Sequence, residues 1–206
     1  LNGMKPNEQM VSVIGCDPGP TNCAVIGIQG PALSSGGMDT HRAELMFVGY
    51  PSVKELMSIS TWRCHSALVE MVNCFHTVLA VEKVTSRFGM NIGSTTFDTC
   101  RNSGIVIMSL NVGLGFEKIY CFGNVDWRIP VTGCARGGDS KTRLSLLELY
   151  GDEFMKELDR KAKELKTEYS LAKPIGCHLR DALGVATGVS LIPSYSGESL
   201  EHFCFM

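Results

Sequence analysis

Several absences in this sequence exclude whole classes of protein. No apolar stretch approaches the roughly 20 residues that a helix needs to cross a bilayer, so we do not expect a membrane-spanning protein. No signal-peptide pattern precedes Val11, which favours a cytoplasmic or nuclear protein over a secreted one. The formal net charge is only −2 at pH 7, so the overall charge gives no reason to expect a nucleic-acid partner.

The nine cysteines lack the patterns of a metal or disulfide framework. Their number is odd, they are dispersed along the chain, and no C-x-x-C pair exists. Most of them lie within apolar patterns, which predicts reduced and mostly buried thiols in a cytosolic or nuclear setting. This argues against a zinc ribbon and a disulfide scaffold, and no sequence signature supports a catalytic cysteine.

The length and composition fit a single globular domain. The chain has 206 residues, of which 44% are hydrophobic and 19% charged. We expect a disordered lead-in over residues 1–10, one domain over residues 11–192 and a tail over residues 193–206. Residues 82–143 carry eight Lys or Arg against five Asp or Glu, a local net charge of +3. Composition alone does not decide whether this segment is a solvated surface or a basic binding face.

The strands are predicted from short apolar runs. Residues 11–28, VSVIGCDPGPTNCAVIGI, indicate two strands joined by a Gly/Pro turn, with Asp17 at the end of the first. Asp beside Pro and Gly also stabilises turns, so this stretch alone supports a turn role equally well. A third strand over residues 44–50 would complete an antiparallel meander. Further buried strands are expected at residues 77–84, which contain Glu82, and at residues 118–122.

Helical spacing of apolar residues predicts most of the remaining chain. The helix before residue 77 would make a crossover to a parallel strand. Residues 129–142 are expected to be a flexible basic loop, and the helix that follows would be capped by Asp139 or Ser140. Apolar residues at helical spacing within residues 94–110 include Phe97, Cys100, Gly104, Ile105 and Met108. The expected helices cover residues 58–75, 94–110, from about 140 onward, 152–169 and 178–192.

Four potential ligands lie at corresponding places in this α/β arrangement. Asp17 and Glu82 each end a buried strand, and sites in such sheets lie outside the carboxyl ends of the strands. His178 and Asp181 are three residues apart and share one face near the start of the closing helix. Taken singly, His178 could be a surface histidine, and Asp181 a carboxylate favoured by the helix dipole. Together they form a set of hard ligands that suits Mg²⁺ or Mn²⁺ better than zinc.

The order and local sequence of these pieces resemble the RuvC-type Holliday junction resolvases, of the ribonuclease H-like superfamily. The resemblance spans roughly residues 11–192 and implies a ribonuclease H-like fold. Its sheet would be five-stranded and mixed, with an antiparallel meander of the first three strands, further parallel strands, and flanking helices. The matching pieces are GCDPGPTN (15–22), AVEKV (80–84), TCRNSGIVI (99–107), VTGCARGGDSK (131–141) and HLRDALGVA (178–186).

The resemblance also implies an activity and a catalytic site. The expected reaction is Mg²⁺-dependent hydrolysis of phosphodiesters by two metal ions, for which Mn²⁺ could substitute. Asp17, Glu82, His178 and Asp181 would be the ligands, with Asp17 shared between the ions. His178 would either ligate an ion or carry a proton. Lys141 matches a basic family position that assists at the scissile phosphate.

The implied substrate is four-way DNA, and its two-fold symmetry implies a homodimer that makes paired nicks. Family members carry an aromatic wedge shortly after the Glu of this strand. Here Thr85 lies three residues after Glu82, and Phe88 lies further along. If the chain is an organellar or viral member of this family, an organelle or a viral replication site is a further possible location. The expected DNA-binding residues are Lys83, Arg87, Phe88, Arg101, Arg136, Lys141 and Arg143.

Two other functions remain open. The motif D-x-G-x-T-N also resembles the first phosphate loop of actin-like and sugar-kinase ATPases, which share the core of the superfamily. Those enzymes need a second Asp-Gly phosphate loop and a second domain, and this sequence contains neither. A catalytically inactive protein that only binds branched DNA is the other alternative, and the complete set of four ligands argues against it.

Overall fold

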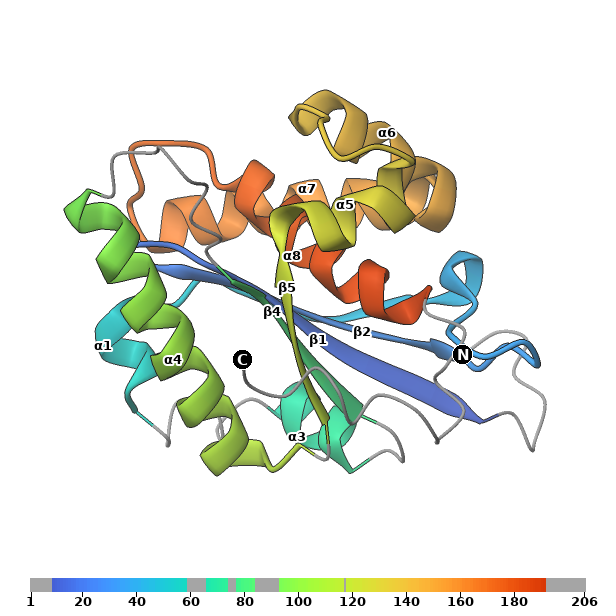
Figure 1. Ribbon diagram of the computed structural model, residues 1–206, viewed down its shortest axis with the longest axis horizontal. Coiled ribbons are helices and arrows are strands. Elements are labelled where there is room, and N and C mark those ends of the chain that lie inside the picture. The colour runs from blue at the N-terminus through green and yellow to red at the C-terminus, as the bar shows by residue number, and fades with distance from the viewer. Residues whose placement is uncertain (1–8, 59–65, 74–76, 84–92, 117, 192–206) are drawn as a thin grey trace.

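A five-stranded mixed sheet with helices on both faces forms the fold (Figure 1). The computed structural model describes residues 9–58, 66–73, 77–83, 93–116 and 118–191. The strand order is β3-β2-β1-β4-β5; β1-β2 and β2-β3 pair antiparallel, and β1-β4 and β4-β5 pair parallel. The predicted meander with added parallel strands is confirmed. The strands are β1 (Met10–Pro18), β2 (Cys23–Pro31), β3 (Glu44–Gly49), β4 (Thr77–Lys83) and β5 (Lys118–Gly123).

Successive residues of the central strands enter two different cores, because side chains alternate between the faces of a sheet. Val13 of β1 and Ala80 of β4 belong to one core, and Ile14 and Leu79 belong to the other. Both faces of β1 and β4 are therefore buried, as their nearly continuous apolar sequences require. The acidic side chains of these two strands, Asp17 and Glu82, lie near their carboxyl ends.

The helices form one layer on each face of the sheet (Figure 1). In one layer, α8 packs directly on β1, β2 and β4. That layer contains α5 (Asn124–Thr132), α6 (Asp139–Tyr150), α7 (Asp152–Glu168) and α8 (Gly176–Ser190). The opposite layer contains α1 (Val53–Leu56), α3 (Ser66–Val72) and α4 (Ser94–Leu114). A short 3-10 helix, η1 (Thr40–Arg42), precedes β3.

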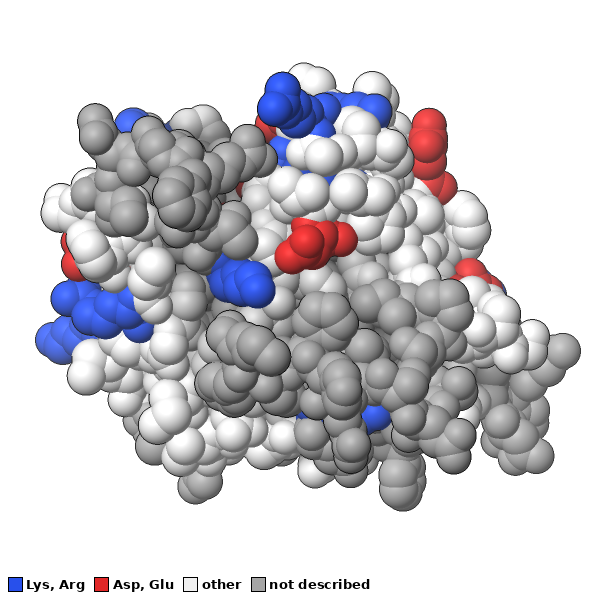
Figure 2. All heavy atoms as spheres, viewed as in Figure 1, with Lys and Arg blue, Asp and Glu red and all other residues white. Residues whose placement is uncertain are grey.

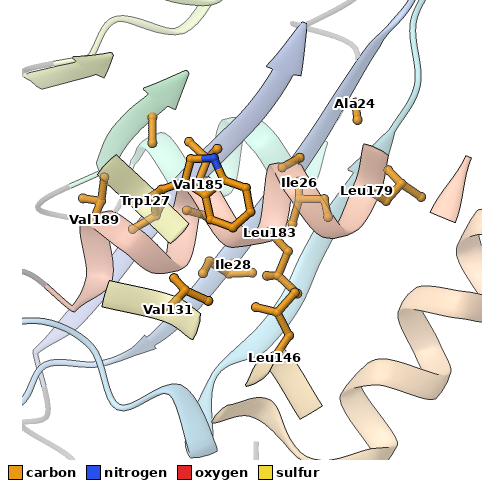
Figure 3. Close-up of a cluster of buried hydrophobic side chains, with 14 of the residues drawn as sticks. Ala24, Ile26, Ile28, Trp127, Val131, Leu146, Leu179, Leu183, Val185 and Val189 are labelled. Atoms are coloured by element: carbon orange, nitrogen blue, oxygen red, sulfur yellow. The ribbon is translucent and has the colours of Figure 1, made fainter. Parts of the chain in front are cut away.

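Glycines at its contacts let α8 pack directly against β1 and against Trp127. A Cβ built on Gly15 of β1 would lie 2.2 Å from the carbonyl oxygen of Ala182, so only glycine fits there. On the other side of α8, a Cβ on Gly184 would lie 2.3 Å from a ring carbon of Trp127. Figure 3 shows the indole of Trp127 against α8, within the core that Ile26 and Ile28 of β2 also line. Small residues thus fix the spacing of β1, α8 and α5.

The predicted loop over residues 129–142 is partly wrong, because its first part belongs to α5. This helix begins after Gly123, whose N–H donates to the Asp126 carboxylate at 2.8 Å, and Trp127 and Val131 are buried beneath it. Burial and capping therefore outweigh the proline at position 130. The next helix is also capped differently from the prediction, since Gly138 and neither Asp139 nor Ser140 is its N-cap.

Several other predictions need correction. Within the predicted helix over residues 58–75, the described helical part is only α3, and residues 59–65 and 74–76 lie outside the described residues. The helix at 94–110 extends to Leu114, and the closing helix runs from Gly176 to Ser190. Phe97 and Met108 have the predicted helical spacing, yet they are 67% and 66% exposed. The inner face of α4 instead carries Asn102, Ser103, Val106, Ser109 and Leu110.

The cysteines are less buried than predicted. Among the described cysteines, all of which are free thiols, only Cys16 and Cys23 are buried. Cys100 is exposed, and the others are half-buried. Within the described part of the chain, no helix is both long and apolar enough to cross a membrane.

Replacing Gly15 with alanine is expected to destabilise the fold, because the added methyl group would collide with the backbone of α8. Overpacking of this kind costs about 1–3 kcal/mol, measurable as a lower urea midpoint. Gly104→Ala is the matched control, since nothing lies within 4 Å of a Cβ at Gly104 in α4. Alanine should stabilise that helix by about 0.5–1 kcal/mol. Equal effects of the two changes would contradict the role of Gly15.

Candidate active site

The parallel pairing of β1 and β4 brings Asp17 and Glu82 together. Cys16 pairs with Val81 in this register, so the two acidic residues that follow are neighbours at the carboxyl ends of adjacent strands. Both follow a residue that points into the α4 core, so both side chains face the α8 side of the sheet. Asp17 and Glu82 are therefore held on rigid, buried strands.

Helix α8 brings His178 and Asp181 to the same place. His178 Nδ1 donates a hydrogen bond to Asp17 Oδ2 at 3.0 Å, between residues 161 positions apart in the chain. This carboxylate raises the pKa of His178, an effect that burial partly opposes. The ring of Tyr50, at the end of β3, lies 6.2 Å from that of His178 between centroids. His178 therefore lies beside the end of β1, although its side chain is 47% exposed.

Burial and neighbouring negative charges raise the pKa values of Glu82 and Asp181. Burial, followed by the negative charge of Asp17, raises the pKa of Glu82 to about 7. The same two causes raise the pKa of Asp181 to about 6, although Arg128 and His178 oppose the shift. Three carboxylates thus share a partly buried space in which their charges repel. A bound cation would relieve that repulsion.

Two side chains from α5 contact this acidic cluster, and the sequence-based prediction missed both. Asn124 Nδ2 donates to Glu82 Oε1 at 2.7 Å, and Arg128 Nη2 lies 3.3 Å from Asp181 Oδ1. Arg128 is only 15% exposed and stacks over Trp127, 5.0 Å from the ring centroid. Their spacing of four residues puts both on one helical face, a signal that a correct helix assignment for α5 would have revealed.

Lys141 lies in the first turn of α6, beside the loop over residues 133–138. Arg128 also donates to the Gly137 carbonyl of this loop, which links the loop to Asp181. A hydrogen bond with Lys141 lowers the pKa of Cys134 in the same loop. Arg180 of α8 holds the start of α6 through two hydrogen bonds to Asp139, at 2.9 and 2.8 Å.

The predicted DNA-binding residues differ in their surroundings. Lys83, Arg136 and Lys141 are exposed. Arg101 pairs with Asp98 at 3.2 Å, and Arg143 pairs with Asp159 at 3.5 Å. Figure 2 shows basic side chains gathered over α6 at the top of the view, and others at the left edge near α1 and α4. Arg87 and Phe88, including the possible wedge, lie outside the described residues, as does Thr85.

The donor set fits a divalent metal ion in its chemistry. Three carboxylates and an imidazole interact electrostatically with one another, and hard cations such as Mg²⁺ prefer carboxylate oxygens. Within the described residues, no three His, Cys, Asp or Glu side chains already stand as a group that could hold a metal ion. Asp17, Glu82 and Asp181 each also contact a protein donor through one carboxylate oxygen. To hold an ion, these side chains would have to come closer together than they stand here.

Glu82→Gln should stabilise the metal-free protein in a pH-dependent way. The folded-state pKa of about 7 lies above the ordinary 4.5, so folding favours the protonated carboxyl. Stability therefore falls as the pH rises from about 4.5 to 7. Gln removes the charge and still accepts from Asn124, so we expect a gain of up to about 3 kcal/mol at pH 8 and little change at pH 4.

Urea unfolding at both pH values, in the presence of a chelator, measures this difference. Glu148→Gln on the exposed surface of α6 is the control and should change the free energy of unfolding by less than about 0.5 kcal/mol. If Glu82→Gln raises the free energy of unfolding equally at pH 4 and pH 8, the charge of Glu82 does not destabilise the fold.

No family model and no curated protein matches the chain. Among solved structures it is similar to Thermus thermophilus RuvC, with 17% identity and a TM-score of 0.52 over 86% of this chain and 92% of that one. For T. thermophilus RuvC in complex with Holliday junction substrate, the identity is 16% and the TM-score 0.53, over 88% of this chain and 93% of that one. For the yeast mitochondrial Holliday junction resolvase, the identity is 11% and the TM-score 0.50, over 93% of this chain and 82% of that one. The chain therefore has the ribonuclease H-like fold of RuvC.

Proposed function

We propose that this protein is a Holliday junction resolvase, an endonuclease that makes paired symmetric nicks in four-way DNA. The observation that carries the proposal is the cluster of Asp17, Glu82, Asp181 and His178 at the carboxyl ends of β1 and β4. The cluster lies in a fold shared with two proteins whose names state junction resolution or binding. Fold alone does not determine function, so the proposal depends on the side chains of this site.

The proposed chemistry is phosphodiester hydrolysis assisted by two Mg²⁺ ions, with Mn²⁺ as a substitute. Asp17, Glu82, Asp181 and His178 would hold the ions, with Asp17 shared between them. When bound, the ions would supply an activated water and stabilise the leaving oxygen. Asn124 orients the Glu82 carboxylate, and the hydrogen bond of His178 orients that of Asp17. Because His178 is half-exposed and has a raised pKa, it could also carry a proton to or from the reacting groups.

The basic residues supply the proposed contacts to DNA phosphates. Lys141 and Arg136 lie next to or within the loop that Arg128 links to Asp181, so they would contact phosphates close to the scissile bond. Lys83 follows Glu82 directly at the end of β4. We also propose Arg101, Arg143, Arg87 and Phe88 as DNA-binding residues. Arg101 and Arg143 would have to exchange their carboxylate partners for phosphates.

The alternatives have less support. An actin-like or sugar-kinase ATPase would need a second phosphate loop that this sequence lacks. The matching RuvC and yeast structures are also covered over 82–93% of their own lengths by this single domain. A protein that only binds junctions would have no need for a cluster of repelling carboxylates, which weakens the fold unless a cation neutralises it.

Asp17→Asn is expected to abolish nicking of a labelled four-way junction while binding is kept or improved. Asn has nearly the same shape, but it lacks the charge that holds a divalent ion, and its neutrality reduces repulsion of DNA phosphates. Gel assays with and without Mg²⁺ measure nicking, and mobility shifts without Mg²⁺ measure binding. Substantial Mg²⁺-dependent nicking by this variant would refute the site, and ATP hydrolysis without nicking by the natural protein would favour the ATPase.

A two-fold symmetric substrate cut by paired nicks needs two active sites, so we also propose a homodimer. The outer face of α4 supports a second copy as its partner. Phe97, Met108 and Val112 are 67%, 66% and 56% exposed on this helix.

Charges on this α4 face fit a second copy of the chain. Asp98 and Arg101 form an exposed ion pair of 3.2 Å beside Phe97. Under two-fold symmetry each residue would meet its opposite charge in the partner, so the pairs can exchange across an interface. Apolar residues with a charged rim are the usual anatomy of such an interface.

Phe97→Glu should convert the dimer to a monomer without unfolding it, because the side chain is exposed and the new charge would be buried in the interface. Sedimentation velocity measures the change in mass. The control is Leu144→Glu, which places the same charge on a 57% exposed leucine of α6 in the other layer. A Phe97→Glu protein that remains dimeric would move the interface away from α4.

A further inference from the structure

Asn102, on the inner face of α4, contacts the turn that follows Asp17. The side chain is completely buried, and its Nδ2 donates to the carbonyl oxygens of Gly19 and Pro20 at 2.8 and 2.9 Å. These contacts join residues that are 83 and 82 positions apart. One amide group therefore binds two successive carbonyls of the Pro18–Asn22 turn, two and three residues beyond Asp17.

The same turn is held from its other side by the segment that follows β3. Asn22 Nδ2 donates to the Tyr50 carbonyl at 3.3 Å, and the Val53 N–H donates to the Thr21 carbonyl at 3.0 Å. Within the turn, the Gly19 N–H donates to the Asn22 carbonyl at 2.9 Å. The end of β1 is thus fixed between two supports, and Asn102 is the contribution of α4.

The packing of Asn102 favours a specific role over simple filling of the core. Its Oδ1 is buried and has no hydrogen-bond partner among the described residues. A buried polar atom without a partner is unfavourable, and an apolar side chain of similar size would avoid that penalty. The two hydrogen bonds of Nδ2 are what an apolar residue could not replace.

We infer that Asn102 is a positioning residue for the active site: by fixing the turn over residues 18–22, it fixes the carboxylate of Asp17. The inference depends on the proposed function, since it assigns Asn102 to the metal-binding arrangement of that site. Asn102 touches none of the reacting groups, and it acts on Asp17 through the backbone of the turn. Loss of the amide should let the strand end move, so that divalent ions bind more weakly.

The test compares Asn102→Leu with two changes on the same helix. Val106→Ala removes buried apolar volume on the inner face of α4 and provides a loss of stability without touching the turn. Ser103→Ala removes only the hydrogen bond from its hydroxyl to the Thr99 carbonyl within the helix. Asn102→Ala also removes both Nδ2 hydrogen bonds and adds no apolar bulk, and it serves if the leucine variant does not fold.

Two measurements are made on each full-length variant. The first is the rise in melting temperature as Mg²⁺ is added without DNA, and the second is the Mg²⁺ concentration for half-maximal nicking of a four-way junction. For Asn102→Leu we expect the concentration for half-maximal nicking to rise about tenfold, equivalent to about 1.4 kcal/mol. The Mg²⁺-induced rise in melting temperature should shrink in parallel, with junction affinity in the absence of metal unchanged.

The controls separate positioning from stability. Val106→Ala and Ser103→Ala should keep both Mg²⁺ responses within about twofold of the natural protein, whatever their melting temperatures. If Asn102→Leu, or Asn102→Ala in its place, also stays within about twofold, Asn102 is only a structural residue and the inference is overturned. If the natural protein itself shows neither Mg²⁺ response nor nicking, the proposed function fails, and the inference fails with it.

Discussion

The close contact between α8 and β1 is the constraint on which the site depends. Gly15 leaves room for the backbone of α8 to lie against the strand, and two residues later the same strand ends in Asp17. Because the helix begins at this end of the sheet, His178 reaches the carboxylate of Asp17. On its outer side α8 accepts Trp127 at Gly184, which brings Asn124 and Arg128 of α5 to the acidic cluster. Gly15 on one side of α8 and Gly184 on the other therefore allow side chains from β1, β4, α5 and α8 to meet.

The charges of the resulting cluster lower the stability of the folded protein. Burial and mutual repulsion raise the pKa values of Glu82 and Asp181 to about 7 and 6, so their ionised forms oppose the folded state near neutral pH. Hydrophobic packing on both faces of the sheet must offset this cost. Arg128, His178 and Asn124 reduce it locally through single contacts to the carboxylates. Such an arrangement suits a site whose charge is completed by a ligand, and it is typical of functional sites.

The strands, and the acidic residues and histidine that meet at their ends, were predictable because their signals are local. Apolar runs ending in Asp17 and Glu82, and the spacing of His178 and Asp181, follow directly from the periods of strands and helices. The contribution of α5 was not predictable in this way, because a proline within the segment suggested a loop, while burial of Trp127 against α8 keeps it helical. Contacts such as that of Asn102 with Gly19 depend on which elements become neighbours, and a single sequence carries no local record of that.

Helix α4 shows why apolar spacing identified a helix but not its orientation. Its inner face includes the buried polar residues Asn102, Ser103 and Ser109, while Phe97 and Met108 face outward. A helix that served only to cover the sheet would have the opposite distribution. Asn102 on the inner face is explained by its hydrogen bonds to the turn beyond Asp17, and the outer apolar face is the one proposed above to contact a partner. If that partner is a second copy of the chain, the same helix joins the proposed dimer interface to the turn beyond Asp17. The two active sites would then be placed relative to each other by the very element that holds each of them in shape.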